Sequence, residues 1–303
     1  MDWLKRLVPA ALFAALLAAV PQAPTTVKEL APGVWVRMGD RTRNQPANTS
    51  WVLFKDYIVV IDANCPWGAR EVLPEIRKTS SKPIRYVFNT HYHGDHAYGG
   101  SLFTDQGAQI ICSSQCAEEY KSKGQPSWDK NNATGDYSLK PYKLSHPTIT
   151  FKEAMTITDG ERELVFKLMG PGHSAGDASA FLPKERILFT GDLCVNWNMG
   201  NNVADADADH DNWLRALDRM AAANPATVVV GHGELGSGTG VLRAQHAYLS
   251  AMIDMVRQGI GEGKSADEVA EAGKAVLAAR HKIGADQERN AASLRAIYRK
   301  LKQ

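Results

Sequence analysis

The sequence predicts a mixed α/β fold in which two β-sheets pack face to face and helices cover their outer sides. Each half of the 303-residue chain contains several short apolar runs rich in β-branched and aromatic residues, which are typical of strands. Between these runs lie segments whose apolar residues recur at helical spacing. At about 150 residues per domain, the length fits two domain-sized units or one large layered domain.

The first half is expected to begin with strands. Lys55-Asp56 separates two apolar runs and predicts a tight hairpin turn. A helix is predicted over residues 68–78, because Val72, Leu73 and Ile76 fall on one of its faces. The strands are expected at residues 34–36, 50–54, 57–62, 84–89 and 109–111, and the other helices at 97–104 and 114–123.

Residues 124–147 are polar and rich in Gly, Pro, Asn and Ser, which predicts a long loop. Long loops in compact domains often act as lids or substrate walls, and a disordered insertion is the alternative. Trp128 is the residue of this segment that could stack on an organic substrate.

The second half repeats the pattern of strands followed by helices. An amphipathic helix is predicted over residues 213–222, with Asp211 or Asn212 as its N-cap. From residue 241 onward the chain is expected to be helical, so a layered domain over 26–240 precedes a helical extension over 241–303. The strands are expected at 155–158, 164–168, 178–182, 186–189 and 227–230, and the C-terminal helices at 241–258, 265–281 and 287–301.

Residues 1–23 predict a secretory signal peptide. Lys5 and Arg6 precede an apolar run over residues 7–20, which is too short to span a membrane comfortably, and cleavage is expected near Ala23. The alternative is that this segment stays attached as an uncleaved anchor. In both cases the folded part is expected to be periplasmic or secreted. The cysteine spacing matches no disulfide framework, so buried free thiols are favoured over pairing at Cys65, Cys112, Cys116 and Cys194.

The charge balance argues against a nucleic-acid partner. The formal net charge is +2, and the chain has no long Lys/Arg run. A small-molecule substrate is expected instead, with no membrane contact beyond the leader; the sequence does not indicate an oligomeric state.

The run Thr90-His91-Tyr92-His93-Gly94-Asp95-His96 directly follows a predicted strand and predicts a metal site. Neutral imidazole is the commonest metal ligand, and a neighbouring carboxylate suits a divalent ion such as zinc. In an extended turn His91 and His93 point the same way, so both can hold one ion, while Asp95 and His96 can reach a second. The alternative is a chance cluster of solvated histidines, which nine His in the whole chain make improbable.

Three further polar residues stand at the ends of predicted strands, next to glycines. They are His173, Asp192 and His232, within Gly172-His173, Gly191-Asp192 and Gly231-His232-Gly233. Strand ends are where rigid scaffolds place chemistry, and glycine allows tight turns close to an ion. One such junction alone is weak evidence for a metal site. The cluster over residues 91–96 followed by these three junctions, four strand ends in all, is strong evidence.

This constellation resembles the metallo-β-lactamase superfamily over roughly residues 30–235. The resemblance implies a four-layer αββα sandwich with the metal site at one edge, here with extra C-terminal helices. It implies that His91, His93 and His173 hold one metal, that Asp95, His96 and His232 hold a second, and that Asp192 bridges the two. Two zinc ions are expected, with iron or manganese possible in place of one or both.

The bridging position separates branches of this superfamily. The zinc β-lactamases have Cys or Ser there, whereas Asp192 resembles the glyoxalase II-like thioesterases, lactonases and other hydrolases. A shifted register with Cys194 as the ligand is the alternative. The resemblance therefore implies hydrolysis of an ester, thioester, lactone or amide by a metal-held hydroxide that Asp95 orients. A zinc β-lactamase, an iron-dependent persulfide dioxygenase-like enzyme and an accessory protein of a secreted redox system stay open as alternatives.

The second half contains two further polar features. Asp205-Ala206-Asp207-Ala208-Asp209 has the first spacings of a calcium loop but lacks the following Gly and the terminal Glu, so a solvated acidic loop is expected. His210 could approach the cleft as a proton donor or substrate contact.

Overall fold

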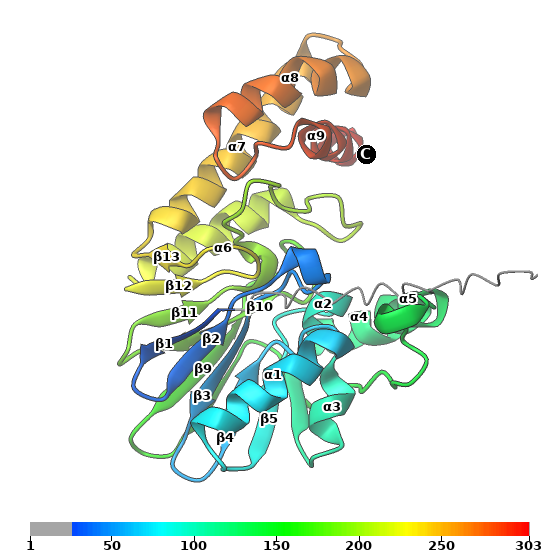
Figure 1. Cartoon of the computed structure of the whole chain (residues 1–303). Helices are drawn as coiled ribbons and strands as arrows, with labels where there is room; N and C mark the ends of the chain where they lie inside the picture. Colours follow the sequence, from blue (N-terminus) through cyan, green and yellow to red (C-terminus); the bar gives the residue numbers. More distant parts are fainter. Residues whose placement is uncertain (1–25, 303) are drawn as a thin grey trace, which may run out of the picture.

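The computed structural model describes residues 26–302, and the predicted signal peptide over residues 1–23 lies outside them. Figure 1 shows a sandwich of two sheets with helices on both outer sides, and a group of helices beyond one end of the sandwich. The first sheet has seven strands in the order β1 to β7, and the second has six in the order β13-β12-β11-β10-β9-β8.

The first sheet begins as an antiparallel meander and continues as a parallel sheet. Strands β1 to β4 pair antiparallel, and the loop between β3 and β4 is the predicted hairpin turn. From β4 to β7 the pairing is parallel, which requires crossover connections such as helix α1. The strands are β1 (Val27–Ala31), β2 (Val34–Arg37), β3 (Thr49–Leu53), β4 (Ile58–Ile61), β5 (Ile84–Phe88), β6 (Gln109–Ser113) and β7 (Ile149–Phe151).

The second sheet is antiparallel except for one pair. Strands β11 and β12 run parallel because helix α6 (His210–Ala222) carries the chain back between them. The strands are β8 (Ala154–Thr158), β9 (Glu163–Leu168), β10 (Ala178–Leu182), β11 (Ile187–Phe189), β12 (Thr227–Val229) and β13 (Gly236–Ser237).

Apolar side chains from both sheets form the central core. Val36, Val59 and Phe88 of the first sheet meet Phe166 and Phe189 of the second in one buried cluster. Alternate residues of the strands point the other way, toward helices: α1 (Pro66–Thr79) and α3 (Gly100–Thr104) cover the first sheet. Helix α6 covers the second sheet. The four-layer αββα class predicted from the sequence is confirmed.

Some predicted helices differ in detail. The helix predicted over 97–104 is two short helices, α2 (Gly94–Ala97) and α3. The segment 114–123 begins as α4 (Ser114–Glu119) and continues as a π-helical turn, Tyr120–Gly124. The predicted loop 124–147 contains the helix α5 (Gln125–Lys130), where Trp128 packs against Tyr98 with ring centroids 4.9 Å apart. The 3-10 turns are η1 (Arg41–Arg43), η3 (Gly135–Tyr137) and η4 (Gly191–Leu193).

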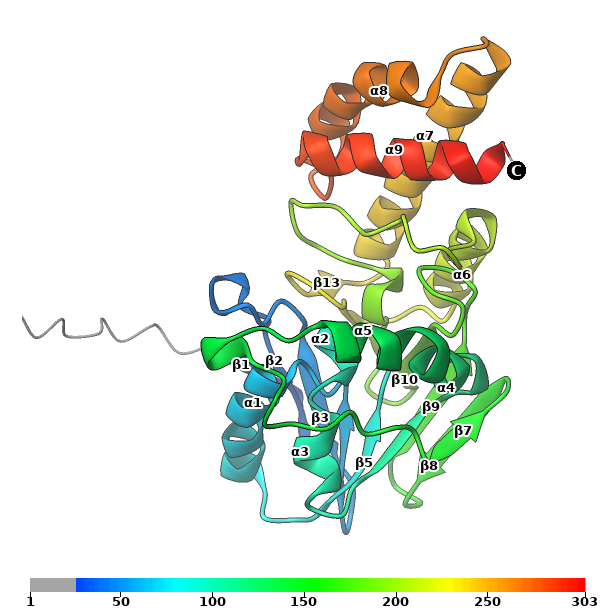
Figure 2. The same ribbon diagram turned by 90° about the vertical axis from the view of Figure 1, so that its right-hand side faces the viewer.

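The C-terminal helices are α7 (Gly240–Gly261), α8 (Ala266–Arg280) and α9 (Gln287–Leu301). Ser265 and Glu268 form a capping box that begins α8. In Figure 2, α9 lies across α7, and the yellow-green chain that follows β11 runs between these helices and the sandwich. Within residues 26–302 no helix has the length and apolarity needed to cross a lipid bilayer.

Candidate metal centre

The structure brings all seven predicted ligands together at one edge of the sandwich. His91 and His93 follow β5, and Asp95 and His96 lie in α2. The other three lie after β9, β11 and β12 of the second sheet. Their donor atoms form two groups, each within 4.8 Å: His91, His93, His173 and Asp192, and Asp95, His96 and His232.

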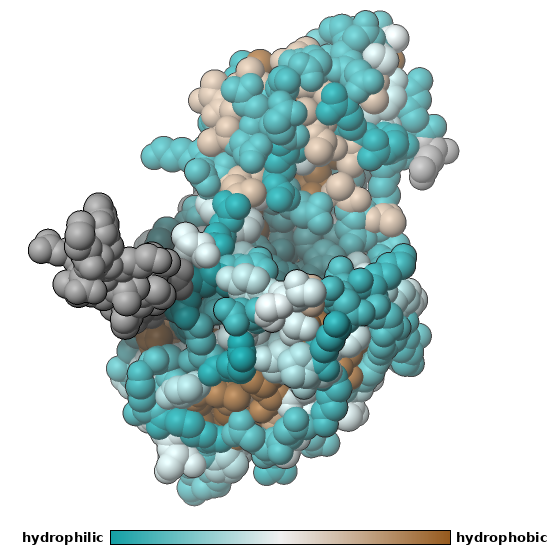
Figure 3. Space-filling model, turned by 45° about the vertical axis from the view of Figure 1, so that its right-hand side comes forward, coloured by the Kyte–Doolittle hydropathy of each residue, from teal (hydrophilic) through white to brown (hydrophobic). Residues whose placement is uncertain are grey.

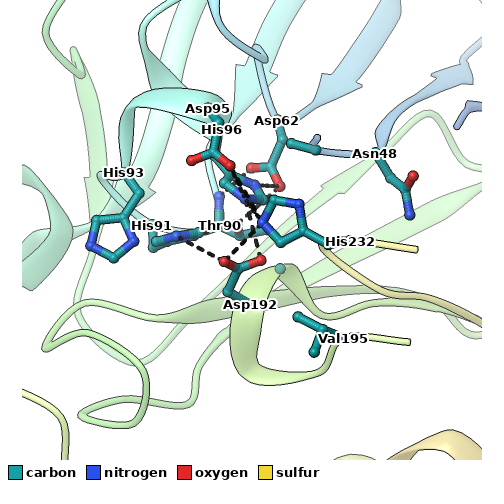
Figure 4. Close-up of polar contacts among 12 residues, drawn as sticks. Asn48, Asp62, Thr90, His91, His93, Asp95, His96, Asp192, Val195 and His232 are labelled. Atoms are coloured by element: carbon teal, nitrogen blue, oxygen red, sulfur yellow. Dashed lines mark hydrogen bonds and ion pairs between the residues drawn. The ribbon is translucent and has the colours of Figure 1, made fainter. Parts of the chain in front are cut away.

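Asp192 belongs to the first group and also contacts the second. Its Oδ2 atom is 3.0 Å from Nε2 of His232 and 3.6 Å from Nε2 of His173. The other oxygen, Oδ1, is 3.3 Å from Nε2 of His96. Figure 4 shows this carboxylate pointing into the space between His91, His96 and His232. A carboxylate in this place can contact both groups at once.

The polar atoms at the centre of the cluster fit a bound metal. Nε2 of His91 is buried and has no hydrogen-bond partner among the described residues. Buried polar atoms without partners are costly, so an inward-facing orphan nitrogen indicates a ligand that protein atoms do not supply. Imidazole and carboxylate donors in this number suit zinc. The residues present therefore fit the predicted metal site.

Asp62 supports the cluster from behind and was missed by the sequence reasoning. Its carboxylate contacts Nδ1 of His96 at 2.8 Å and accepts hydrogen bonds from the backbone N–H and the hydroxyl of Thr90. The Thr90 hydroxyl in turn lies 3.0 Å from Nδ1 of His91. Asp62 itself has a left-handed backbone, with φ of 62°. A polar residue directly after β4 is the same strand-end signal that indicated the other ligands.

Asp205 and Asn202 contact the first group from outside. Oδ2 of Asp205 lies 3.1 Å from Nε2 of His93, and the carbonyl oxygen of Asn202 lies 2.9 Å from Nδ1 of His173. The prediction that residues 205–209 form a solvated acidic loop is wrong for Asp205, whose side chain is 9% exposed. Asp209 is the N-cap of α6 in place of the predicted Asp211 or Asn212.

Close backbone approach explains the glycine beside His232. A Cβ atom on Gly231 would lie 2.0 Å from Oδ1 of Asp192, so a side chain there would displace the carboxylate. Asn48 holds the same turn, because its amide donates to the carbonyl oxygens of Val230 and Gly233. The β2–β3 loop, which carries Asn48, thus fixes the turn that holds His232; both residues are labelled in Figure 4.

Burial keeps two of the three histidines of the first group neutral, whereas at His93 burial is outweighed by the hydrogen bond to Asp205 and the nearby carboxylates, which raise the pKa. Burial lowers the pKa of His91 well below the usual value, and the neighbouring His96 and His93 lower it further. Burial also lowers the pKa of His173 to about 4, again with a contribution from His93. Neutral imidazoles are the form that binds metal.

In the second group the pKa of both histidines is raised. Burial lowers the pKa of His96, but Asp192, Asp62 and Asp95 outweigh this and hold the pKa well above the usual value. The pKa of His232 is also raised, because Asp192 outweighs burial. In return, His232 and His96 outweigh burial at Asp192 and hold the pKa of that carboxyl well below its usual value.

The chain after η4 forms part of the wall of the centre. The Trp197 ring stacks on His232 with centroids 4.5 Å apart, and the guanidinium of Arg41 lies 5.4 Å from the Trp197 ring centre.

The alternative ligand Cys194 and the possible substrate contact His210 do not reach the metal centre. The Cys194 thiol faces the Val241 carbonyl at 3.6 Å, and Nε2 of His210 faces the Val203 carbonyl at 3.0 Å. All four cysteines are buried and free, as expected.

A family model described as the Metallo-beta-lactamase superfamily matches residues 43–232. The chain belongs to the metallo-beta-lactamase superfamily. It is therefore a member of a group of generally hydrolytic metalloenzymes.

Similar proteins include metallo-beta-lactamases. Metallo-beta-lactamase IND-1 of Chryseobacterium indologenes is 25% identical over 63% of this chain and 74% of its own. A metallo-beta-lactamase structure from Pontibacter korlensis covers 75% of this chain and 99% of its own, with 24% identity and a TM-score of 0.61.

Alkylsulfatases are also similar to this chain. The linear primary-alkylsulfatase of a Pseudomonas species is 23% identical over 67% of this chain, which spans 45% of that protein. A structure of the sec-alkyl sulfatase PisA1 covers 91% of this chain and 50% of its own, with 18% identity and a TM-score of 0.68. The superfamily fold predicted from the motifs is confirmed, including the C-terminal helices.

Proposed function

We propose that this chain is a hydrolase that uses two zinc ions, held by the clustered ligands, to cleave an ester, thioester, lactone or amide. The observation that carries the proposal is the position of Asp192, whose carboxylate contacts imidazoles of both groups. Iron or manganese in place of one or both zinc ions fits the same donors, because all of them accept imidazole and carboxylate ligands.

The seven ligands would hold the two ions in two sets that share Asp192. One ion would be held by His91, His93 and His173, and the second by Asp95, His96 and His232, with Asp192 shared. When bound, two close divalent ions supply Lewis acidity and lower the pKa of water.

Asp95 is the proposed catalytic residue. Its carboxylate lies 3.4 Å from Nε2 of His232 and is 32% exposed, whereas the His232 side chain is 5% exposed. Asp95 therefore faces the solvent side of the centre, where substrate arrives. There its carboxylate can accept a proton from the attacking water and fix the direction of attack.

The test replaces one ligand from each sheet. In His91→Ala and Asp192→Ala we expect hydrolysis to be abolished over a panel of lactone, thioester, ester and phosphodiester substrates, and bound metal by elemental analysis to fall. His246→Ala is the matched control, because His246 pairs with Asp218 outside the cluster and should leave both quantities unchanged. Full hydrolysis by a metal-free ligand variant would overturn the proposal.

Two further substrate classes belong in the panel because of specific relatives. Nitrocefin tests β-lactam hydrolysis, which the lactamase relatives suggest. A primary alkyl sulfate tests sulfate-ester hydrolysis, which the linear primary-alkylsulfatase relative suggests. Turnover of one class alone would name the substrate.

Two non-hydrolytic alternatives have their own readouts. Oxygen uptake by protein with bound iron would indicate a persulfide dioxygenase-like enzyme. Bound metal without turnover of any class would fit the remaining alternative, an accessory protein of a secreted redox system.

We also propose that the protein works outside the cytoplasm, on the basis of residues 1–23. Mass spectrometry of protein recovered from a periplasmic fraction should give an N-terminus near Ala23. An intact Met1 in cytoplasmic protein would contradict this.

A further inference from the structure

We infer that Asp205 is a positioning residue that orients the metal ligand His93, and that helix α9 keeps Asp205 in place through the backbone of its loop. The inference concerns the metal centre of the proposed function and rests on it. It links the C-terminal helices to the chemistry of the sandwich.

The two ring nitrogens of His93 face in different directions. Nδ1 lies 2.9 Å from Nε2 of His173, inside the cluster, and Nε2 lies 3.1 Å from Oδ2 of Asp205, outside it. A carboxylate that accepts the Nε2–H leaves the lone pair on Nδ1, the nitrogen that faces the metal position. Such partners fix the tautomer and the ring orientation of metal-ligating histidines.

Asp205 is itself held by several donors. The Tyr92 hydroxyl donates to Oδ2 at 3.0 Å, and the Lys123 ammonium group and the backbone N–H of Asp207 donate to Oδ1 at 3.1 and 3.0 Å. Lys123 lies in the π-helical turn that follows α4, and such turns are frequent at functional sites. With both oxygens engaged and the side chain 9% exposed, the carboxylate has one orientation toward His93.

The same loop contacts a second ligand of the first group. The carbonyl oxygen of Asn202 lies 2.9 Å from Nδ1 of His173, so the proton of that ring sits on Nδ1 and Nε2 faces the cluster. One segment, residues 202–205, thus orients two of the three imidazoles of the first group.

Helix α9 and the turn before it hold this loop. Nζ of Lys300 donates to the carbonyl oxygen of Ala206 at 3.1 Å and to that of Ala208, on either side of Asp207. At the start of the loop, Met199 pairs with Gly284 in an isolated β-bridge.

The support from α9 is local. Figure 3 shows the molecule hollowed between the C-terminal helices and the sandwich. A cavity of about 330 Å³ separates the loop from α9, and its lining residues include Asp205, His210 and Lys300. The hydrogen bonds of Lys300 cross from the helix to the loop beside this cavity, so this side chain is the point at which α9 can affect the loop.

Asp205→Asn tests the positioning role, with Asp207→Asn as its matched control. Asp207 belongs to the same loop and pairs with the same Lys123, but its carboxylate is not among the contacts of His93. Metal affinity is measured by competition with a chromophoric chelator, and the visible spectrum of the Co²⁺-loaded protein reports the ligand geometry. We expect Asp205→Asn to weaken the affinity of one of the two metal equivalents by about 10- to 100-fold and to change its Co²⁺ spectrum. Asp207→Asn should leave both at the parent values.

The outcomes separate the inference from the function on which it rests. Parent affinity and spectrum in Asp205→Asn would overturn the positioning role, as would equal losses in both variants, because those would reflect general loosening of the loop. If the unaltered protein binds no Co²⁺ or Zn²⁺, the proposed function itself fails.

Lys300→Met tests the contribution of α9, with Lys302→Met as control. Lys302 is the C-cap residue directly after α9 and contacts the Tyr298 ring instead of the loop. We expect a loss of metal affinity in Lys300→Met that is smaller than the loss in Asp205→Asn, with no change in Lys302→Met. If Lys300→Met binds metal with the affinity of the unaltered protein, α9 does not help to keep Asp205 in place.

Discussion

At the residue scale, the two ligand groups differ in protonation before any metal binds. His91 and His173 have lowered pKa values and are neutral near pH 7. His96 and His232 have raised pKa values, chiefly because Asp192 offsets their burial. A metal that enters the second group must therefore displace protons from both histidines, whereas in the first group only His93 has a raised pKa and competes for a proton.

This difference predicts the pH dependence of metal binding. Protons compete with metal only where the pKa of the ligand lies near or above the working pH. The apparent affinity of the Asp95–His96–His232 group should therefore rise with pH up to the raised pKa values, with proton release on binding. The affinity of the first group should depend less on pH, because His91 and His173 have lowered pKa values and only His93 has a raised one.

Calorimetric titration of metal-free protein in two buffers with different ionisation heats measures the protons released. Asp192→Asn is the matched variant, because loss of its charge should lower the pKa of His96 and His232 and reduce the proton release. Equal release at both metal equivalents would contradict the prediction.

At the scale of the element, the ends of predicted strands were the feature from which the metal ligands could be predicted. Each predicted ligand follows a strand or opens the short helix behind one, and apolar runs mark strands well. Asp62 obeys the same rule and could have been found by it. Asp205 could not, because its contact with His93 joins residues that are 112 positions apart, and the spacing of an acidic loop contains no information about its partner.

The turn after β12 provides a test at this scale. In Gly231→Ala the new Cβ would lie 2.0 Å from Oδ1 of Asp192, so the carboxylate or the turn must move. We expect weaker metal binding and a loss of activity of at least about tenfold, since small displacements of catalytic groups are costly. Elemental analysis and steady-state kinetics measure the two effects.

Gly240→Ala is the control for this substitution. Gly240 opens α7, and a Cβ there meets no atom within 4 Å, so metal content and activity should stay at the parent values. Unchanged metal content and activity in Gly231→Ala would show that the approach of this backbone to Asp192 does not matter for the site.

At the scale of the whole molecule, the C-terminal helices share a core with the second sheet. Leu188 and Val228 of that sheet, Trp213 of α6, Leu249 of α7 and Leu294 of α9 belong to one continuous buried cluster. The sequence predicted the helices, but the periodicity of a helix does not show what its apolar face packs against. The division into units over 26–240 and 241–303 stays a prediction, and the shared core argues that the two parts unfold together.

Leu294→Ala tests that cooperativity in metal-free protein. Leu294 is fully buried, so its truncation should lower the free energy of unfolding by about 2–5 kcal/mol. With a shared core, urea unfolding followed by far-UV circular dichroism and by tryptophan fluorescence should give coincident transitions that both shift. Arg299→Ala, at an exposed site on the same helix, should change the stability by less than about 0.5 kcal/mol. Two separate transitions, with Leu294→Ala moving only one, would instead show that α7 to α9 fold as a unit of their own, and the support that α9 gives to the Asp205 loop would then come from a part able to open independently of the sandwich.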